Sequence, residues 1–301
     1  MPYFALPRRQ PFHLPHARYA LVIPAMALLA GCISRPESPI LEPAAGTVAA
    51  ATATAARVDA LLPTDALLIG EQHDAAEHHQ IEQQVVAHLA GRGLLAALAL
   101  EMADAGVSTA KLKPSATEQQ TRNALKWNDK GWPWAAYGPA VMTAVRAGIP
   151  VLGANLPAAQ MKDSMGDAKL DVQLPGPALK AQQQLIRIGH CNLLPESQIT
   201  PMTRIQVAKD MTMAKTIEEV ALPGKVVVLL AGNGHVNRQL GVPQHLPATL
   251  HAKAVQLRAG DATEKDLAFD STWATPPLAE KDYCAGLKAQ LEGKGGVGSM
   301  R

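Results

Sequence analysis

Acidic and imidazole side chains gather directly after the first strongly apolar segment of the chain. Residues 67–70 are typical of the end of a buried strand, and Glu71, His73 and Asp74 follow at once. The next segment, 75–90, has the apolar spacing of a helix. In open α/β sheets, ligands bind outside the carboxyl ends of the strands. The turn after this strand therefore predicts a polar site.

Other predicted strands end in the same way. Glu101 follows the apolar segment 94–100, Asn155 comes just after 149–153, and His235 comes shortly after 225–231. Parallel strands bring their carboxyl ends to one edge of a sheet, so we expect a single pocket formed by Glu71, His73, Asp74, Glu101, Asn155 and His235. Carboxylates beside imidazoles can bind a divalent metal, transfer protons or hold a polar ligand. The plainer alternative is that they only satisfy backbone groups in the turns.

The elements that must position these residues alternate between strand and helix. A strand, a helix and a second strand over 65–100 make a βαβ unit, which implies parallel strands. Helical segments are expected around 103–148 and 157–222, and the second is interpreted as a lid or layer. We predict an α/β fold with a mostly parallel central sheet, flanking helices and a helical lid or insertion. We expect this fold to form one domain over 57–290, followed by a disordered tail over 291–301.

The N-terminal residues 1–31 have the parts of a bacterial lipoprotein signal peptide. Three arginines precede the apolar segment 19–29, which is too short to span a bilayer as a mature helix. The tetrapeptide Leu-Ala-Gly-Cys that ends at Cys32 resembles a lipobox, in which the cysteine is lipidated. An ordinary signal peptide with a chance cysteine is the alternative.

A lipid-anchored flexible tether is expected over 32–56, because this segment is rich in Pro, Ala, Thr and Ser. Ile33 and Ser34 follow the cysteine, where an Asp would favour retention in the inner membrane. We therefore expect an outer-membrane lipoprotein whose domain faces the periplasm. In that oxidising compartment Cys191 and Cys284 form the expected disulfide, with one reactive and one buried thiol as the alternative.

Composition narrows the classes of ligand. The chain is 48% hydrophobic and 18% charged, and its net charge of +2 comes with no cluster of Lys and Arg, which argues against nucleic acid. Aromatic residues are scarce, yet segment 127–139 holds three of the four Trp and one of the four Tyr. Such a segment is either a packing plug or a surface for a flat ligand.

Four short motifs resemble those of the ChaN-like haem-binding lipoproteins, which belong with the Tiki and TraB proteins and erythromycin esterase. These motifs are residues 70–74 (Gly-Glu-Gln-His-Asp), 98–102, 134–139 and 231–235. The resemblance implies haem as the ligand, bound by a homodimer that encloses two haems face to face. It also implies a Tyr ligand to the haem iron and a His on the propionates. We assign these roles to Tyr137 and His79, with Tyr283 as the competing tyrosine.

Two functions follow from these observations. The first is a carrier, rather than an enzyme, in iron or haem uptake, with its receptor or transporter left open. The alternative is a periplasmic hydrolase that depends on a divalent metal and uses Glu71, His73, Glu101 and His235, because the esterase and Tiki relatives use acidic and His residues at comparable strand ends. There His73 would act as base and Glu101 as acid or ligand. A structural lipoprotein with a degenerate site is the third interpretation.

Overall fold

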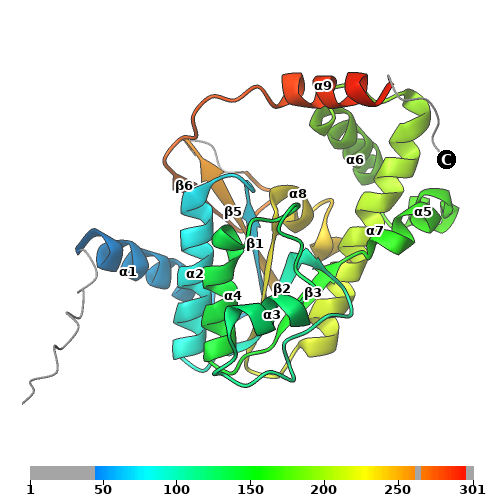
Figure 1. The fold of residues 1–301 in the computed structure, drawn as a ribbon. Coiled ribbons are helices and arrows are strands. Elements are labelled where there is room, and N and C mark those ends of the chain that lie inside the picture. Colours follow the sequence, from blue (N-terminus) through cyan, green and yellow to red (C-terminus); the bar gives the residue numbers. More distant parts are fainter. Residues whose placement is uncertain (1–44, 262–265, 296–301) are drawn as a thin grey trace, which may run out of the picture. The chain divides into compact units, whose positions relative to one another are not determined.

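The computed structural model describes residues 45–261 and 266–295. The predicted signal peptide, the lipidation site Cys32 and the first part of the tether lie outside these residues. The sheet has six strands in the order β3-β2-β4-β1-β5-β6, and every neighbouring pair is parallel (Figure 1). The predicted α/β class is confirmed. The strands are β1 Ala66–Glu71, β2 Leu95–Asp104, β3 Val151–Asn155, β4 Val226–Gly232, β5 Ala252–Ala259 and β6 Ser271–Thr275.

The central strands are apolar throughout because helices cover both faces of the sheet. Side chains alternate between the faces along each strand. Leu67 and Ile69 of β1 lie in one core, with residues of α2 (Ala76–Gly91) and α4 (Trp134–Arg146). Leu68 lies in the other core, with Met213 and Ile217 of α7. α7 runs from Glu196 to Val220 and covers that second face (Figure 1).

Strand register fixes which side chains meet at the carboxyl edge of the sheet. Glu71, the last residue of β1, pairs with Gly232, the last residue of β4. Leu100 of β2 pairs with Leu230 of β4, so Glu101 follows on the other side of the same central strand. β2 changes register between Leu100 and Asp104 against β3, which marks an irregularity at this edge. The sheet therefore presents Glu71 and Glu101 on either side of β4.

The remaining helices surround this framework. α3 (Glu118–Ala124) begins with a capping box, in which Thr117 and Gln120 satisfy each other's backbone N–H groups. The predicted helical layer is realised by α7 together with two helices and a short 3-10 turn. The elements not yet described are α1 Ala45–Asp59, α5 Ala158–Gly166, η1 Ala168–Val172, α6 Gly176–Gly189, α8 Asn233–Val236, η2 Val242–His245 and α9 Tyr283–Gly295. No helix of the described residues has the length and apolarity needed to cross a membrane.

Three segments differ from the prediction. The sixth strand β6 was not expected, because a short edge strand lacks the continuous apolar run of a central one. α1 begins at Ala45, inside the expected tether, since its Ala-rich sequence favours a helix. Its Thr54 donates a hydrogen bond of 2.6 Å to the Gln84 side chain on α2. α9 continues to Gly295, so the first five residues of the expected disordered tail are helical.

Cys191 and Cys284 form a disulfide across a separation of 93 positions. Cys191 follows α6, and Cys284 lies in the first turn of α9. The expected pairing is present in the structure, and the alternative of one reactive and one buried thiol is not. The bond closes a loop that contains β4, β5 and β6, so it restricts the unfolded chain over a long segment.

Replacing both cysteines, in the variant Cys191→Ser/Cys284→Ser, is expected to lower the free energy of unfolding by ~2–4 kcal/mol, because the unfolded chain regains the freedom that the loop removes. Thermal unfolding measured with and without reductant checks this. The wild-type protein should lose melting temperature on reduction, whereas the double variant should not respond. Equal melting temperatures for all samples would contradict a stabilising role.

Candidate functional site

The carboxyl edge of the sheet carries two pairs of a carboxylate and an imidazole. In the first pair, Nδ1 of His73 lies 2.8 Å from Oε1 of Glu71. In the second, Nε2 of His235 lies 3.2 Å from Oε1 of Glu101. Both carboxylates are buried, and His73 is the more accessible imidazole, with its side chain 43% exposed. Four of the six residues that the sequence singled out for this pocket thus form these two pairs.

Gly232 joins the two pairs into one group, which we call the strand-end cluster. Its backbone N–H donates a hydrogen bond of 2.8 Å to Oε2 of Glu101. A Cβ atom at this position would lie 3.0 Å from Nε2 of His73 and 3.6 Å from Oε2 of Glu101. Glycine therefore allows the His73 ring to lie against the end of β4 and beside the second carboxylate.

Asp210 of α7 completes the second pair on the far side of the imidazole. Its Oδ1 lies 2.5 Å from Nδ1 of His235, and Nε2 of Gln206 lies 3.1 Å from the same nitrogen. Burial alone would lower the pKa of His235, but the charges of Glu101 and Asp210 raise it to about 10. His235 is consequently an imidazolium held between two carboxylates. Burial raises the pKa of Asp210 to about 6, against the opposing effect of the imidazolium.

Glu71 is the centre of the first pair. Burial would raise its pKa, but the neighbouring imidazoles of His73 and His79 hold it at about 2. The Tyr137 hydroxyl donates a hydrogen bond of 2.8 Å to Oε1 of Glu71. Burial and the charge of Glu71 raise the pKa of Tyr137 far above its ordinary value, so the phenol is neutral. The pKa of His73 is raised by Glu71 and Glu101 despite burial. The raised pKa favours the protonated imidazole, which could offer a proton or a positive charge to a ligand.

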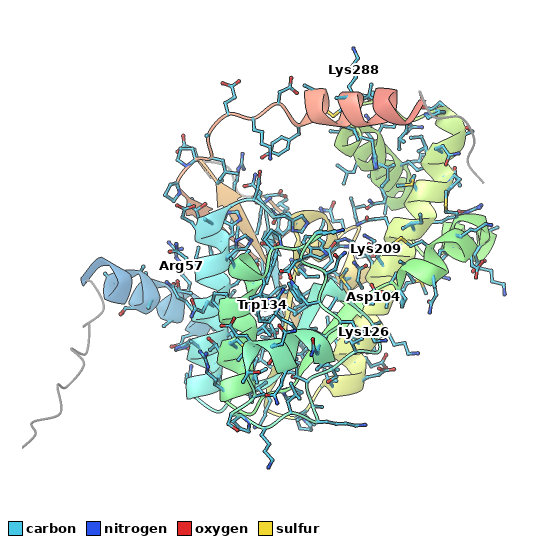
Figure 2. The ribbon with its side chains drawn as sticks, in the orientation of Figure 1. Arg57, Asp104, Lys126, Trp134, Lys209 and Lys288 are labelled. Carbon is cyan, nitrogen blue, oxygen red and sulfur yellow. A yellow bond between two sulfur atoms is a disulfide. The ribbon has the colours of Figure 1, made fainter. Side chains whose placement is uncertain are left out.

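The aromatic segment is buried in one part and accessible in another. Trp134, labelled in Figure 2, and Tyr137 are buried on α4 and pack with Trp127. Trp132 is only half-buried and meets the His73 ring edge to face, with centroids 4.8 Å apart. The buried part of the segment is a packing plug, and Trp132 lines a pocket.

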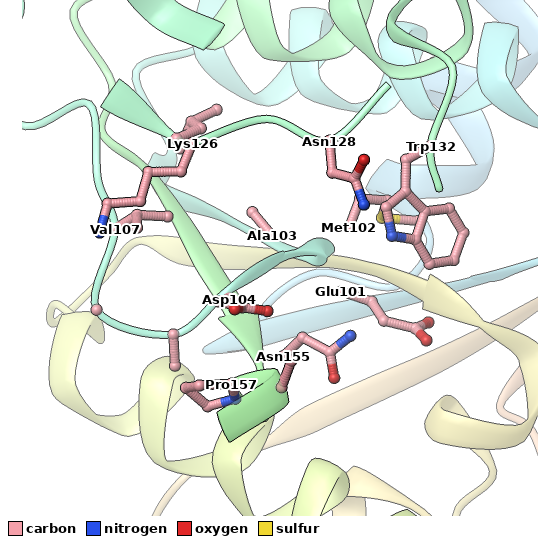
Figure 3. Close-up of a pocket in the computed structure, with 14 residues that line it drawn as sticks. Glu101, Met102, Ala103, Asp104, Val107, Lys126, Asn128, Trp132, Asn155 and Pro157 are labelled. Carbon is pink, nitrogen blue, oxygen red and sulfur yellow. The ribbon is translucent and has the colours of Figure 1, made fainter. Parts of the chain in front are cut away.

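A pocket of about 390 Å³ lies beside Trp132 (Figure 3). Glu101 and Asn155 reach it from the strand ends, and Lys126 lines it from the loop after α3. The side-chain oxygen of Asn155 is buried without a hydrogen-bond partner among the described residues. With Asp104 and Asn128, which also line it, the pocket combines an indole, two carboxylates, two amides and a cation around one opening.

Two predicted site residues lie elsewhere. Asp74 faces the tail, where its Oδ2 accepts a 2.5 Å hydrogen bond from the Tyr283 hydroxyl and lies 3.5 Å from Nζ of Lys281. Its turn carries it to the exposed side, so it does not join the pocket. His79 was expected at a propionate, yet its side chain is 11% exposed and its Nε2 lies 2.9 Å from Oε2 of Glu71. The helix turns this imidazole inward.

Sequence reasoning missed three residues of the cluster: Glu82, Gln206 and Asp210. Glu82 interrupts the apolar side of α2 close to Val85 and Val86, and that break in the apolar pattern was a usable signal. Gln206 and Asp210 lie four positions apart and so share one face of α7. Their partner His235 is more than twenty positions away, and no local pattern gives that contact.

The side chains that could hold a metal ion do not line the pocket. His235 belongs to the predicted hydrolase site, and both of its ring nitrogens already face carboxylates. Glu71, His79 and Glu82 instead offer one ligand atom each, all within 4.8 Å of one another. The strand-end cluster itself is arranged to hold protons and charge, which are properties of a polar ligand site or an acid–base site.

The chain's relatives agree with this geometry. The family model described as haem-binding uptake, Tiki superfamily, ChaN matches residues 57–246. The chain belongs to this family. The matched segment contains every residue of the strand-end cluster, and the membership supports haem binding and uptake as the general function. No curated protein sequence matches the chain.

Solved structures extend the comparison. A structure described as cofacial heme binding to ChaN of Campylobacter jejuni is 27% identical, covers 71% of this chain and 88% of that chain, and has a TM-score of 0.59. The type III effector HopBA1 is 18% identical over 71% of this chain and 88% of its own, with a TM-score of 0.43. The first match supports the ChaN membership and the α/β fold.

The buried imidazolium makes a testable contribution to stability. The pKa of His235 is about 10 in the folded protein and ~6.5 in an unfolded chain. Its stabilising effect is therefore complete below pH ~6.5 and is lost as the pH rises towards 10. Urea unfolding of the wild-type protein between pH 6.5 and 9.5 should show a falling free energy of unfolding. His235→Asn should be less stable at pH 6.5 and lack most of this slope; equal slopes would place the proton elsewhere.

Proposed function

We propose that this protein binds haem as cargo in iron or haem uptake, at the carboxyl edge of its sheet. The observation that carries the proposal is the ChaN family match, which spans residues 57–246 and so contains the whole strand-end cluster. The Campylobacter jejuni relative is described as binding heme cofacially. By analogy, two copies of this chain would enclose two haems face to face, and haem would induce the homodimer.

The pocket beside Trp132 supports this choice of ligand. A porphyrin stacked against a second porphyrin needs protein contact on one face only, so an open pocket of about 390 Å³ next to an indole is adequate. Porphyrin rings bind largely apolar surfaces with a few fixed polar groups. The exposed Lys126 at the pocket lining supplies a positive charge for a propionate. It replaces His79 in this role, since His79 faces Glu71.

Tyr137 is the proposed iron ligand. It is the one tyrosine in the matched segment 57–246, since the others are Tyr3, Tyr19 and Tyr283. Phenolate oxygen is a known ligand of haem iron. Glu71 accepts the hydrogen bond of the phenol and is placed to take its proton when a cation binds the oxygen.

Access to this ligand requires movement. Tyr137 is 1% exposed, and Trp132 lies edge to face against it with ring centroids 5.9 Å apart. The proposal therefore includes displacement of Trp132 and its loop on haem binding. Tyr283 is the accessible alternative: it is 53% exposed and hydrogen-bonded to Asp74, but it lies outside the matched segment.

Location is part of the same proposal. The lipobox at Cys32 and the export signal before it support a lipid anchor in the bacterial outer membrane, with the folded domain in the periplasm. A disulfide between Cys191 and Cys284 is consistent with an oxidising compartment. An anchored carrier at that surface would keep haem close to the membrane that it must cross.

Titration with hemin tests the function and the ligand together. The wild-type protein should show a saturable Soret spectrum near one haem per chain and should elute as a dimer when loaded. Tyr137→Phe should shift the Soret band and weaken binding by at least ~10-fold, because it removes the iron–oxygen bond. Tyr283→Phe is the matched control and should bind as the wild type does.

Other outcomes separate the identity of the iron ligand from haem binding itself. A Soret change confined to Tyr283→Phe would move the iron ligand to the tail and leave haem binding intact. Weak, unsaturable binding by the wild-type chain that stays monomeric would contradict the carrier function itself. Circular dichroism of both variants shows whether a loss of binding reflects a loss of fold.

A further inference from the structure

Three ligand-type side chains meet behind the strand-end pocket, between the end of β1 and the first turns of α2. Glu71 comes from the strand, and His79 and Glu82 come from the helix. His79 and Glu82 are three positions apart, so they lie on the same face of α2. One ligand atom from each side chain lies within 4.8 Å of the others. This spacing is compatible with a single ion at the centre.

The polar atoms of this group are unpartnered although they are buried. Oε2 of Glu71, Nε2 of His79 and both carboxylate oxygens of Glu82 have no hydrogen-bond partner among the described residues. Nε2 of His79 approaches Oε2 of Glu71 to 2.9 Å, but without the direction of a hydrogen bond. Buried polar atoms nearly always have a partner, so four in one place need an explanation.

Glu82 is the decisive residue. It is 0% exposed, and no Lys or Arg of the described chain forms an ion pair with it or with Glu71. A second carboxylate beside the first is therefore unfavourable unless a proton or a cation lies between them.

We propose that Glu71, His79 and Glu82 bind a divalent transition-metal ion of the Zn²⁺, Mn²⁺ or Fe²⁺ class. Two carboxylates and one imidazole are a donor set that such ions accept. The ligand atoms are Oε2 of Glu71, Nε2 of His79 and an oxygen of Glu82. Tyr137 and His73 both contact the other oxygen of Glu71, and such contacts orient a metal-binding carboxylate.

A shared proton is the competing explanation. A protonated Glu82 lies close enough to Glu71 to donate a hydrogen bond to it, and that proton would remove the repulsion between the two carboxylates. The imidazole of His79 would still remain without a partner for Nε2. One ion engages all four unpartnered atoms or their carboxyl groups together, which a single proton does not. The metal site shares Glu71 with the proposed iron ligand Tyr137, but it uses neither Trp132 nor the pocket, so Glu82→Gln tests it separately from haem binding.

Isothermal titration of the purified, EDTA-treated chain, prepared without a histidine tag, tests the site with Zn²⁺ and Mn²⁺ in turn. One of these ions should bind saturably near one per chain and raise the melting temperature. Glu82→Gln keeps the shape of the side chain and should weaken binding at least 10-fold and abolish that rise. Glu77→Gln makes the same change on the same helix, outside the group, and should bind like the wild type.

Co²⁺ absorption gives a second readout that does not rely on stability. The wild-type chain should give a visible ligand-field spectrum that His79→Asn removes, which keeps the test informative if Glu82→Gln does not fold. Two results would overturn the proposal. The first is no saturable binding in the wild type together with equal or greater stability of Glu82→Gln, as a shared proton predicts. The second is binding that survives both variants.

Discussion

The buried carboxylate of Glu71 is the contact on which the edge of the sheet depends. An ionised group at the end of a central strand is costly to bury unless donors surround it. The chain supplies two of them, His73 from the turn after β1 and Tyr137 from α4, and the His79 imidazole of α2 lies 2.9 Å from the other oxygen. Each donor fixes one element against the strand end. The aromatic segment is thereby held over the site, and Trp132 packs against His73.

At the other side of β4, the buried carboxylate of Glu101 is stabilised by a positive charge. His235 is positive, and Glu101 and Asp210 flank it on either side. Glu101 also accepts the backbone N–H of Gly232, so the end of β4 is part of the arrangement. The two halves share one glycine, and a Cβ atom at that position would crowd the His73 ring at 3.0 Å. Removing any member would leave a buried charge without its partner, which is more damaging than removing the whole group.

Burial of Tyr137 links the fold to the proposed haem function. The phenol is neutral and enclosed in this structure, so haem binding is coupled to a movement of the aromatic segment. The same carboxylate that holds the phenol also belongs to the proposed metal site, through its other oxygen. Glu71 thus lies between two ligand sites of different chemistry. A change in the charge or position of Glu71 would therefore affect both the proposed iron ligand and the proposed metal site.

The sequence by itself determined the class of the fold and the edge at which the site lies. Continuous apolar runs gave five of the six strands, and the polar residues that end them gave Glu71, His73, Glu101 and His235. These signals are local, since a run of buried residues and the residue that terminates it can be recognised from neighbours in the chain. The disulfide followed from an export signal and a count of cysteines. β6 was not predicted, because a short edge strand lacks a continuous apolar run.

Only the tertiary structure decided which way the remaining side chains point and what they meet. Asp74 and His79 have the residue types of the site and lie close to it in sequence, but the turn directs the first outward and the helix directs the second beneath the pocket. Glu82 and Asp210 reach the cluster through the packing of α2 and α7 on the sheet. Their contacts join residues far apart in the chain, and the free energy of burying each carboxylate depends on those partners. Such energies are absent from any local pattern, so the sequence located the site and packing determined its chemistry.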